Sequence, residues 1–489
     1  MRFCFDKKEL VEKEIDANKL AVIGSDFNLT WSKFNTQVQQ TVDVFKKFNL
    51  HKSANSVIVY GHKSANMMVA FYALMKLEVP YIPIDIIYPT DRINKVIEIS
   101  GCEVIINTHT DGLNCPGTSE IILKEDNITV PESIRFQQTD QSVTDPLIYT
   151  IFTSGSTGEP KGVQITTEAV RSFTRWMTSD FGFTNNEIFI NSAILSFDLS
   201  VFEVMTFAAI GGTILLNDKG HTADPALMIK RIQQYQGTTW VSTPSYAILY
   251  ARMDTTDDLS SIQNFLFCGE ILPHALAKTL KAKFKNAKVW NTYGPTEATV
   301  ATTLVEITED TLAKYDPLPV GTSKKESELL IENGEIIIVG PNVSIGYLNQ
   351  PKLNAEKFIT INNQRAFKTG DQGKIMDDML FFAGRNDDLV KLHGYRIELN
   401  EISSVMNNLP YIIQAETIAL KRNDVVKKIV SLVQLKNDSQ RTAQEIKADI
   451  AASLPPYMIP ADIKIIDAIP LNQNGKADKK LLKALYMKK

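Results

Sequence analysis

The sequence is poor in the residues that hold metals and disulfides. Its four cysteines form no CxxC pair, and its six histidines include no HExxH motif. Structural zinc sites use closely spaced ligands of these kinds, and disulfide-stapled domains need a denser set of cysteines. The sequence therefore predicts neither a zinc site nor a disulfide frame, and a reducing cytoplasm suits it best.

Long apolar runs and an excess of positive charge are also absent. The most apolar stretch, residues 204–216, is too short to cross a bilayer and is interrupted by Gly211 and Gly212, so we expect a buried helix followed by a strand. Charges break up the first residues, MRFCFDKKELVEKEID, where a secretory signal would need an apolar core. The net charge of −4 offers no broad basic surface to nucleic acid. We expect no membrane span, no export and no nucleic-acid partner.

The chain instead has the length and patterning of a large α/β protein. Its 489 residues exceed one ordinary domain, and 44% hydrophobic with 22% charged residues is typical of a globular chain. From Ser56 the β-rich runs SVIVY, PYIPID and EVIIN alternate with apolar-periodic helices. This alternation predicts mainly parallel sheets flanked by helices, with ligands bound at the carboxyl ends of the strands.

The texture changes in the last third of the chain. From Gly334 the runs become shorter and more β-rich, which predicts a small β-barrel-like part, and GRNDD at residues 384–388 combines charge with turn formers. About a hundred residues of alternating helix and strand follow. We predict a large domain over residues 1–385 and a small α+β domain over residues 386–489.

One loop has the composition of a phosphate site. Between two β-rich runs, residues 153–162 read TSGSTGEPKG, in which glycines free the backbone N–H groups, hydroxyls add donors and Lys161 adds charge. The alternative is a flexible hairpin tip. The loop is not a Walker A motif, because Pro160 and Gly162 stand where a glycine and a hydroxyl are needed, and it is not a GxSxG elbow.

Together with NTYGPTEATV at residues 291–300, KTGD at 368–371 and NGKADKK at 474–480, this loop resembles the adenylate-forming superfamily. That superfamily contains acyl-CoA synthetases, luciferases and the adenylation domains of peptide synthetases. SFDLSVFEV, WVSTPSY, FLFCGEILP, KLHGYRIELNEI and SLPPYMIP are most similar to the D-alanine–D-alanyl carrier protein ligases. The segment 321–334 looks shorter than in those relatives, and Leu389 stands where they commonly have glutamine.

The resemblance implies a two-step reaction. ATP and D-alanine give D-alanyl-AMP, and the acyl group then passes to the phosphopantetheine thiol of a separate carrier protein, on the route that D-alanylates teichoic acids. ATP and Mg²⁺ are the implied cofactors. Two alternatives stay open: a ligase for another small acid that uses CoA or a peptide-synthetase carrier, and a nucleotide-binding regulatory protein that has lost catalysis.

The resemblance also implies the nucleotide site. Lys476 would be the catalytic lysine that bridges the substrate carboxylate and the α-phosphate, Glu297 would carry Mg²⁺, and Asp387 would be the hinge of a mobile C-terminal domain. Tyr293 would stack on adenine, and Asp371 and Arg385 would contact the ribose. Taken alone, Tyr293 could be a buried aromatic residue, and Arg385 could belong to a surface ion pair. The full set of implied ATP contacts is Thr153, Ser154, Gly155, Ser156, Thr157, Gly158, Lys161, Asn291, Thr292, Tyr293, Gly294, Pro295, Thr296, Asp371, Phe382, Ala383, Gly384, Arg385 and Lys476.

Asp198 is the residue that points to an amino-acid substrate. An unpaired carboxylate in the apolar setting AILSFDLSVFEV would be costly, and an α-ammonium is its natural partner, although Asp198 could instead cap a helix. By resemblance, Cys268 lies beside the substrate α-carbon and favours the D enantiomer, although an isolated cysteine there would be a small buried hydrophobe. The implied D-alanine contacts are Asp198, Cys268, Gly294, Val300 and Lys476.

Overall fold

The computed structural model describes residues 15–50, 56–109, 111–113, 115–125, 127–131, 145–155, 159–253, 259–385, 389–422, 425–436, 439, 441–470 and 477–487. The chain divides into two compact units. The first comprises residues 1–85, 100–151 and 162–384, and the second comprises residues 86–99, 152–161 and 385–489. No described helix has both the length and the apolar character needed to cross a membrane. The predicted boundary at residue 385 stays a prediction.

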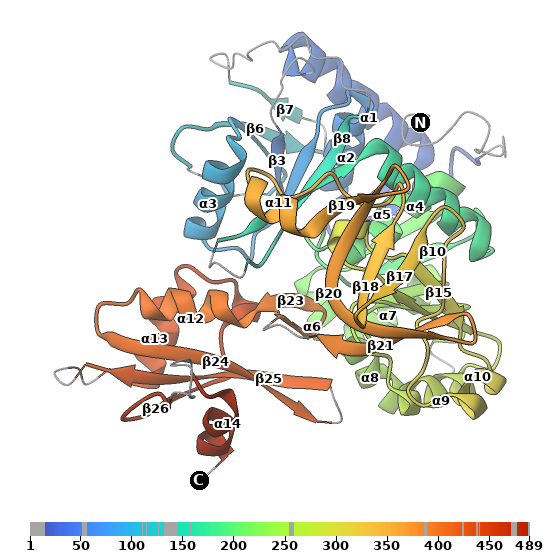
Figure 1. Cartoon of the computed structure of the whole chain (residues 1–489). Coiled ribbons are helices and arrows are strands. Elements are labelled where there is room, and N and C mark those ends of the chain that lie inside the picture. Colours follow the sequence, from blue (N-terminus) through green and yellow to red (C-terminus); the bar gives the residue numbers. More distant parts are fainter. Residues whose placement is uncertain are drawn as a thin grey trace. The chain divides into compact units, whose positions relative to one another are not determined.

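A nine-stranded sheet forms the centre of the first unit (Figure 1). Six neighbouring strands, β14, β13, β12, β10, β11 and β1, run parallel, as the alternating pattern predicted. The strand order is β16 (Thr322–Ser323), β15 (Thr303–Glu306), β14 (Lys288–Tyr293), β13 (Asn264–Phe267), β12 (Thr239–Ser242), β10 (Ile188–Asn191), β11 (Thr213–Leu216), β1 (Leu20–Ile23) and β2 (Asn28–Thr30).

A seven-stranded sheet contains the first βαβ units. Strands β3, β4 and β5 pair in parallel, with Val57 opposite Tyr81 and Ile58 opposite Ile105. The order is β7 (Asn127–Thr129), β6 (Ser119–Lys124), β5 (Val104–Asn107), β3 (Val57–Gly61), β4 (Tyr81–Asp85), β8 (Leu147–Thr153) and β9 (Lys161–Thr166). The last two strands flank the predicted phosphate loop. Its sequence context, a strand on each side, is therefore confirmed.

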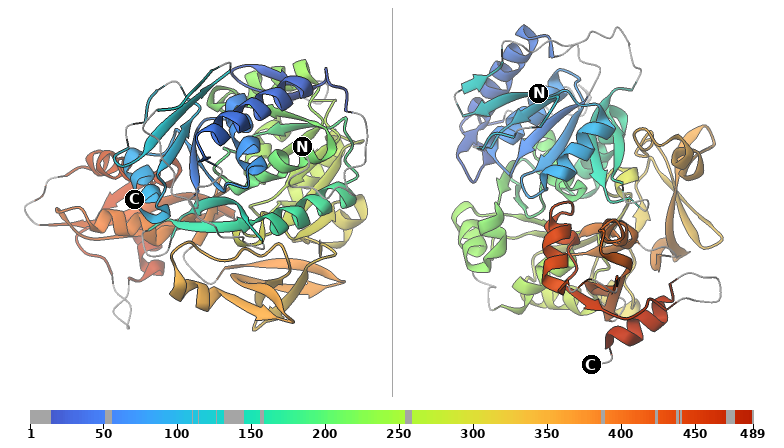
Figure 2. Two further views of the ribbon diagram at one scale, coloured as in Figure 1. Left: turned by 90° about the horizontal axis from the view of Figure 1, so that it is seen from above. Right: turned by 90° about the vertical axis from the view of Figure 1, so that its left-hand side faces the viewer.

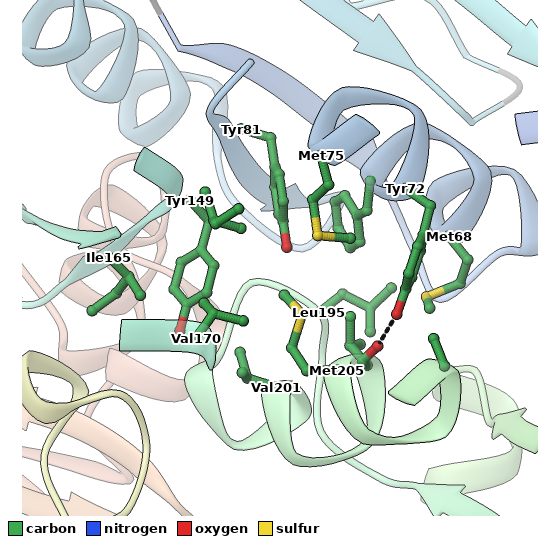
Figure 3. Packing of buried hydrophobic residues seen from close by; sticks show 14 of the residues in the cluster. Met68, Tyr72, Met75, Tyr81, Tyr149, Ile165, Val170, Leu195, Val201 and Met205 are labelled. Atoms are coloured by element: carbon green, nitrogen blue, oxygen red, sulfur yellow. Dashed lines mark hydrogen bonds between the residues drawn. The ribbon is translucent and has the colours of Figure 1, made fainter. Parts of the chain in front are cut away.

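Helices between the two sheets build the main core. The core contains α1 (Trp31–Lys47), α2 (Ala65–Lys76), α4 (Thr167–Asp180) and α5 (Val201–Ile210), together with strands from both sheets. Eleven of the twelve residues of α2 are buried, so this helix is apolar all round. Figure 3 shows residues of α2 and α5 facing one another, with the Tyr72 hydroxyl donating to the Val204 carbonyl at 2.6 Å.

The other face of the nine-stranded sheet has its own core. Residues of α7 (Pro225–Tyr235), α8 (Pro244–Arg252), α9 (His274–Lys283) and α10 (Glu309–Lys314) pack there against strand residues such as Trp240 and Phe265. Two short helices, η2 (Asp198–Ser200) and η3 (Thr296–Ala298), and α6 (Lys219–Ala223) follow strands of this sheet. As predicted for residues 204–216, α5 ends at Gly211 in a left-handed conformation with φ 70°, and β11 follows.

A smaller antiparallel sheet completes the first unit. Its order is β17 (Glu328–Glu332), β18 (Glu335–Val339), β20 (Gln364–Met376) and β19 (Phe358–Ile361), with β21 (Met379–Arg385) paired to β20 and α11 (Pro351–Lys357) before β19. In both views of Figure 2 it forms an orange block separate from the larger sheets. The segment expected to be short closes in a two-residue turn, in which Asn333 and Gly334 have φ of 51° and 83°.

The second unit is a compact α+β structure. Its sheet has the order β24 (Ile412–Arg422), β25 (Val425–Leu435), β26 (Asp462–Ile465), and a separate hairpin pairs β22 (Leu389–Leu392) with β23 (Tyr395–Glu398). One face packs on α12 (Leu399–Asn407) and α13 (Ala443–Ala451), and the other on α14 (Lys479–Met487). Figure 1 shows these helices on opposite sides of β24 and β25. This unit also includes most of α3 (Thr90–Ser100) and residues 152–161, and its short helix η4 spans Pro456–Met458.

Candidate active site

Most of the predicted amino-acid and nucleotide residues follow parallel strands of the nine-stranded sheet. Asp198 lies after β10, Cys268 directly after β13, and Gly294 directly after β14. Because parallel strands end at the same edge of a sheet, their following loops meet there, which is where α/β proteins bind ligands. The sheet therefore brings together residues that are about a hundred positions apart in the sequence.

The Asp198 carboxylate is buried and hydrogen-bonded across this edge. Its side chain is 8% exposed, and Oδ2 accepts a hydrogen bond from the Thr296 hydroxyl at 2.6 Å. The helix that follows, α5, has Ser200 at its N-cap, and that residue makes no side-chain capping bond. Asp198 opens the short helix η2 and does not cap α5. A buried carboxylate aimed at a loop edge is suited to a cationic group.

Cys268, Gly294 and Val300 lie next to one another. The Cys268 thiol donates to the Val300 carbonyl at 3.8 Å, and a Cβ built on Gly294 would lie 2.9 Å from that same carbonyl. The same Cβ would be 2.5 Å from the Ala301 Cα atom, so only glycine fits at this position. The three residues predicted to contact a small amino acid thus form one close-packed group.

The backbone beside this group adopts a rare conformation. Thr299 and Val300 have φ of 53° and 69°, in the left-handed region that β-branched residues seldom enter. The Thr299 hydroxyl donates to the Asn342 carbonyl at 2.7 Å, and the Asn342 amide donates to the Ala298 carbonyl at 2.9 Å. Conformations of this kind persist where the surroundings hold them, and they cluster at functional sites.

Tyr293 and Asp371 form a second pair in the first unit. The Tyr293 hydroxyl donates to Asp371 Oδ2 at 2.6 Å, although the two residues come from β14 and β20. The Tyr293 and Phe382 rings have centroids 5.9 Å apart. Ala383, Gly384 and Arg385 follow Phe382 at the end of β21. Two other predicted contacts support the sheet: Asn291 donates to the Pro319 carbonyl at 2.7 Å, and Thr292 to the Phe267 carbonyl at 2.9 Å.

Glu297 is fully buried and is held by a residue that the sequence did not single out. The Tyr347 hydroxyl donates to Glu297 Oε1 at 2.6 Å. Within the described part of the chain, no three His, Cys, Asp or Glu residues gather into a group that could hold a metal ion. Mg²⁺ takes one or two carboxylates and completes its shell with waters and phosphate oxygens. A single carboxylate fits a magnesium ion that arrives with a nucleotide, and it does not fit a resident metal.

The phosphate loop, in the second unit, holds carboxylates. The Gly155 N–H donates to Glu401 Oε2 at 2.9 Å, and Lys161 Nζ lies 3.5 Å from Glu398 Oε1. The Ser154 hydroxyl donates to the Arg396 carbonyl at 2.8 Å and accepts from the Glu398 N–H at 3.0 Å. The Thr153 hydroxyl donates a long hydrogen bond, of 3.5 Å, to the Lys161 carbonyl. The loop therefore presents donors and a cation to anionic oxygens.

Close packing restricts the described residues at the two ends of this loop. A Cβ on Gly155 would lie 1.8 Å from the Glu159 carbonyl oxygen, so a side chain cannot be placed there. The Glu401 carboxylate also pairs with Arg92 of α3. Burial raises the pKa of Glu401, while Arg92 and the Gly155 N–H act in the opposite direction. Ser156, Thr157, Gly158, Asp387 and Lys476 lie outside the described residues.

Two segments of the chain match known families. Residues 12–348 match the family described as AMP-binding enzyme, and residues 401–476 match the AMP-binding enzyme C-terminal domain. The chain is an AMP-binding enzyme. The two matches together confirm the predicted membership of the adenylate-forming superfamily, and they include the site residues from Thr153 to Val300.

This AMP-binding enzyme has relatives of nearly equal length. It is 38% identical over 483 residues to a D-alanine--D-alanyl carrier protein ligase of Bacillus licheniformis, which covers 95% of this chain and 96% of the relative. It is 37% identical over 450 residues to the ligase of that name from Bacillus cereus strain G9842, with 87% of this chain and 88% of the relative covered. The family resemblance drawn from the motifs is confirmed.

Solved structures share the fold. The adenylation domain AlmE of Vibrio cholerae, in complex with glycyl-adenosine-5'-phosphate, has a TM-score of 0.82 at 20% identity, with 97% of this chain and 96% of that chain covered. The o-succinylbenzoate CoA synthetase of Bacillus subtilis has a TM-score of 0.80 at 20% identity, with 96% of each chain covered. Likeness at this identity concerns the fold, and it confirms the predicted α/β class.

Sequence reasoning missed several partners of the predicted residues. Tyr347 is 50 positions from Glu297, and Glu401 is 246 positions from Gly155. Neither stands in a motif that names its partner, because the contact depends on how distant strands and loops meet. The apolar neighbours of Glu401 in ELNEI were a usable signal, since a carboxylate among apolar residues needs a partner.

Proposed function

We propose that this AMP-binding enzyme activates D-alanine with ATP and transfers it to the phosphopantetheine thiol of a separate carrier protein, for the D-alanylation of teichoic acids. The reaction is supported by the names of relatives that the chain matches over almost their whole length. The structural observation that carries the proposal is the buried Asp198 carboxylate at the loop edge, 2.6 Å from Thr296. In the proposal the reaction takes place in the cytoplasm.

The amino-acid end of the proposed site selects a small ammonium-bearing acid. Asp198 pairs with the α-ammonium, which a fatty acid does not have. Cys268, Gly294 and Val300 lie against one another, and in the proposal they admit only a side chain as small as a methyl group. The same group supplies a chiral surface, so the Cys268 thiol is the residue we assign to the preference for D over L.

The nucleotide end combines an aromatic residue with a carboxylate. In the proposal Tyr293 lies along the adenine ring, Asp371 accepts the ribose hydroxyls, and Arg385 adds a second ribose contact. The phosphate loop holds the phosphates, whose oxygens replace those of Glu401 and Glu398 on the Gly155 N–H and Lys161. Glu297 carries Mg²⁺, which when bound neutralises phosphate charge.

The proposed reaction has two chemical steps. An oxygen of the D-alanine carboxylate attacks the α-phosphorus, the bond to the β-phosphate oxygen breaks, and pyrophosphate leaves. Negative charge on the non-bridging oxygens is met by preorganised donors, among which we place Lys476. The carrier thiol, losing its proton, next attacks the acyl carbon, and AMP leaves. We propose that residues 386–489 turn about Asp387 between the steps, so that Lys476 is in place only for the first.

ATP–pyrophosphate exchange with a panel of acids tests the proposal. D-alanine should support the fastest exchange, with L-alanine and glycine slower and fatty acids inactive. Exchange that is fastest with another amino acid, or with a fatty acid, would reject D-alanine as the substrate. Nucleotide binding with no acyl-AMP for any acid would instead identify a regulatory protein that has lost catalysis.

A further inference from the structure

A lysine after β3 is buried, and its side-chain hydrogen bonds to the described residues go to carbonyl groups and not to carboxylates. Lys63 is 1% exposed, and its Nζ donates to the Ser192 carbonyl at 2.6 Å and to the Asn217 carbonyl at 2.7 Å. It follows a strand of the seven-stranded sheet, whereas both acceptors follow strands of the nine-stranded sheet. The resemblance assigned no role to this residue, and the chemistry described above does not use it.

The two carbonyls mark the carboxyl ends of neighbouring strands. Ser192 is the first residue after β10 and Asn217 the first after β11, and these strands pair in parallel with Asn191 opposite Leu216. The Asn217 amide also donates to the Asn191 carbonyl at 3.0 Å. Lys63 therefore links the carboxyl ends of two parallel strands, where the loops that follow them begin.

The loop that leaves β10 leads directly to Asp198. Five residues lie between Ser192 and Asp198, and the loop is anchored at both ends. At its start, Ser192 holds Lys63 through its carbonyl and donates through its hydroxyl to the Val241 carbonyl at 2.7 Å. At its end, Asp198 is held by Thr296. Between them, the Phe197 N–H donates to the Ile194 carbonyl at 3.0 Å, which makes a tight turn.

We propose that Lys63 is a positioning residue, which fixes the exit of β10 so that Asp198 is aimed at the amino group of the substrate. The inference rests on the proposed function, because it needs an ammonium-bearing substrate at Asp198. A displacement of about 1 Å at a binding group is enough to cost a large part of a rate or an affinity, so a remote anchor can have a measurable effect.

The surroundings of Lys63 fit an anchor. Asp85, Glu203 and Asp218 are the acidic groups that act on it, and burial outweighs their effect and lowers the pKa of Lys63 to about 8. Asp85 accepts from His62 Nδ1 at 2.8 Å, and burial raises the pKa of Glu203 well above its usual range. Of these three groups, Asp85 already accepts a hydrogen bond from His62, and burial disfavours the charged form of Glu203. A lysine has at least two N–H donors in either protonation state, so both carbonyl bonds persist across neutral pH.

A matched control exists in the same sheet. Lys19 Nζ donates to the Asn185 carbonyl and, at 3.1 Å, to the Gly211 carbonyl, which precede β10 and β11. Lys19 thus connects the amino ends of β10 and β11, as Lys63 connects their carboxyl ends. Lys63→Met and Lys19→Met each remove a lysine that holds two carbonyls, but only the first loosens the loop to Asp198.

The experiment compares KM and kcat in ATP–pyrophosphate exchange for the full chain and both variants. We expect Lys63→Met to raise KM for D-alanine by about tenfold and to leave KM for ATP within about twofold, whereas Lys19→Met changes neither. The inference would be overturned if the two variants had equal KM for D-alanine. It would also be overturned if Lys63→Met raised KM for D-alanine and KM for ATP by the same factor. If a Met variant does not fold, Lys63→Gln and Lys19→Gln make the same comparison.

The wild-type control separates the two proposals. If exchange requires another amino acid, D-alanine is rejected, and the Lys63 comparison is made with that amino acid, since the ammonium is common to all. If D-alanine supports exchange but Lys63→Met matches Lys19→Met, the proposed function stands and the positioning role is rejected. If no amino acid supports exchange, both are rejected.

Discussion

Replacing Asp198 by asparagine isolates the charge that binds the amino group in this account. Asparagine keeps the size of the side chain and can still accept from Thr296, but it cannot pair with an ammonium. Because Asp198 is only 8% exposed, the pair that it forms is shielded from water. Removing one partner of a buried pair costs about 3–5 kcal/mol. At about 1.4 kcal/mol for each factor of ten, kcat/KM for D-alanine should fall by roughly 10²- to 10⁴-fold.

A smaller change at the same contact should have a smaller effect. Thr296→Val removes the hydroxyl that donates to Asp198 at 2.6 Å and leaves the carboxylate itself in place. A hydrogen bond to a charged group contributes about 1.5–3 kcal/mol, so kcat/KM should fall by roughly 10- to 150-fold. The order of the two variants is part of the prediction, because it follows from removing the charge in one and a donor to it in the other.

The assay is ATP–pyrophosphate exchange at several D-alanine concentrations, with Glu203→Gln as the control. Glu203 is also a buried carboxyl group of this region, and burial raises its pKa well above the usual range, which favours the uncharged form. Glutamine is uncharged and similar in size, so it should change kcat/KM little. The reasoning is refuted if Asp198→Asn stays within about threefold of the wild type, or if Glu203→Gln loses as much activity as Asp198→Asn.

Three further outcomes are expected. Cys268→Ala should increase the use of L-alanine relative to D-alanine in the exchange assay, because it removes the thiol packed against Val300; an unchanged D/L ratio contradicts this. Lys476→Ala should nearly abolish exchange while the thermal midpoint stays that of the wild type, and near-normal exchange would refute the assignment. Burial lowers the pKa of Lys324 from 10.5 to about 7, and its Nζ lies 5.7 Å from the Trp176 ring centroid. Between those pH values the unfolded chain binds one more proton at this residue than the folded chain, so the free energy of unfolding should rise with pH from 7 to 10. Thermal midpoints measured over this range should rise less steeply in Lys324→Met. An unchanged slope in that variant would contradict the prediction.

The fold could be predicted largely because its signals are local. The runs SVIVY and PYIPID became β3 and β4, and the helix between them is apolar on every side, which in a soluble protein requires cover on all faces. The assignment of residues to the second unit could not be predicted. Residues 86–99 and 152–161 join it through contacts such as Arg92 with Glu401, which are hundreds of positions apart.

The candidate site was predictable where one motif carries several of its residues. Gly294, Thr296 and Glu297 stand together in YGPTE, so finding one finds the rest. Their partners were not predictable, since Tyr347 reaches Glu297 from beyond β18, and Asp371 reaches Tyr293 from β20. The contacts of Lys63 could not be predicted for the same reason. Nothing near it in the sequence indicates that it donates to the carbonyls of Ser192 and Asn217.

In the proposed reaction one chain both activates D-alanine and delivers it to a carrier. The most direct measurement is mass spectrometry of a phosphopantetheinylated D-alanyl carrier protein after incubation with the enzyme, ATP, Mg²⁺ and either D- or L-alanine. We predict that the carrier gains one alanyl group with D-alanine, much less with L-alanine, and none when the phosphopantetheine is missing. An unmodified carrier, in a reaction that has formed D-alanyl-AMP, would contradict the account.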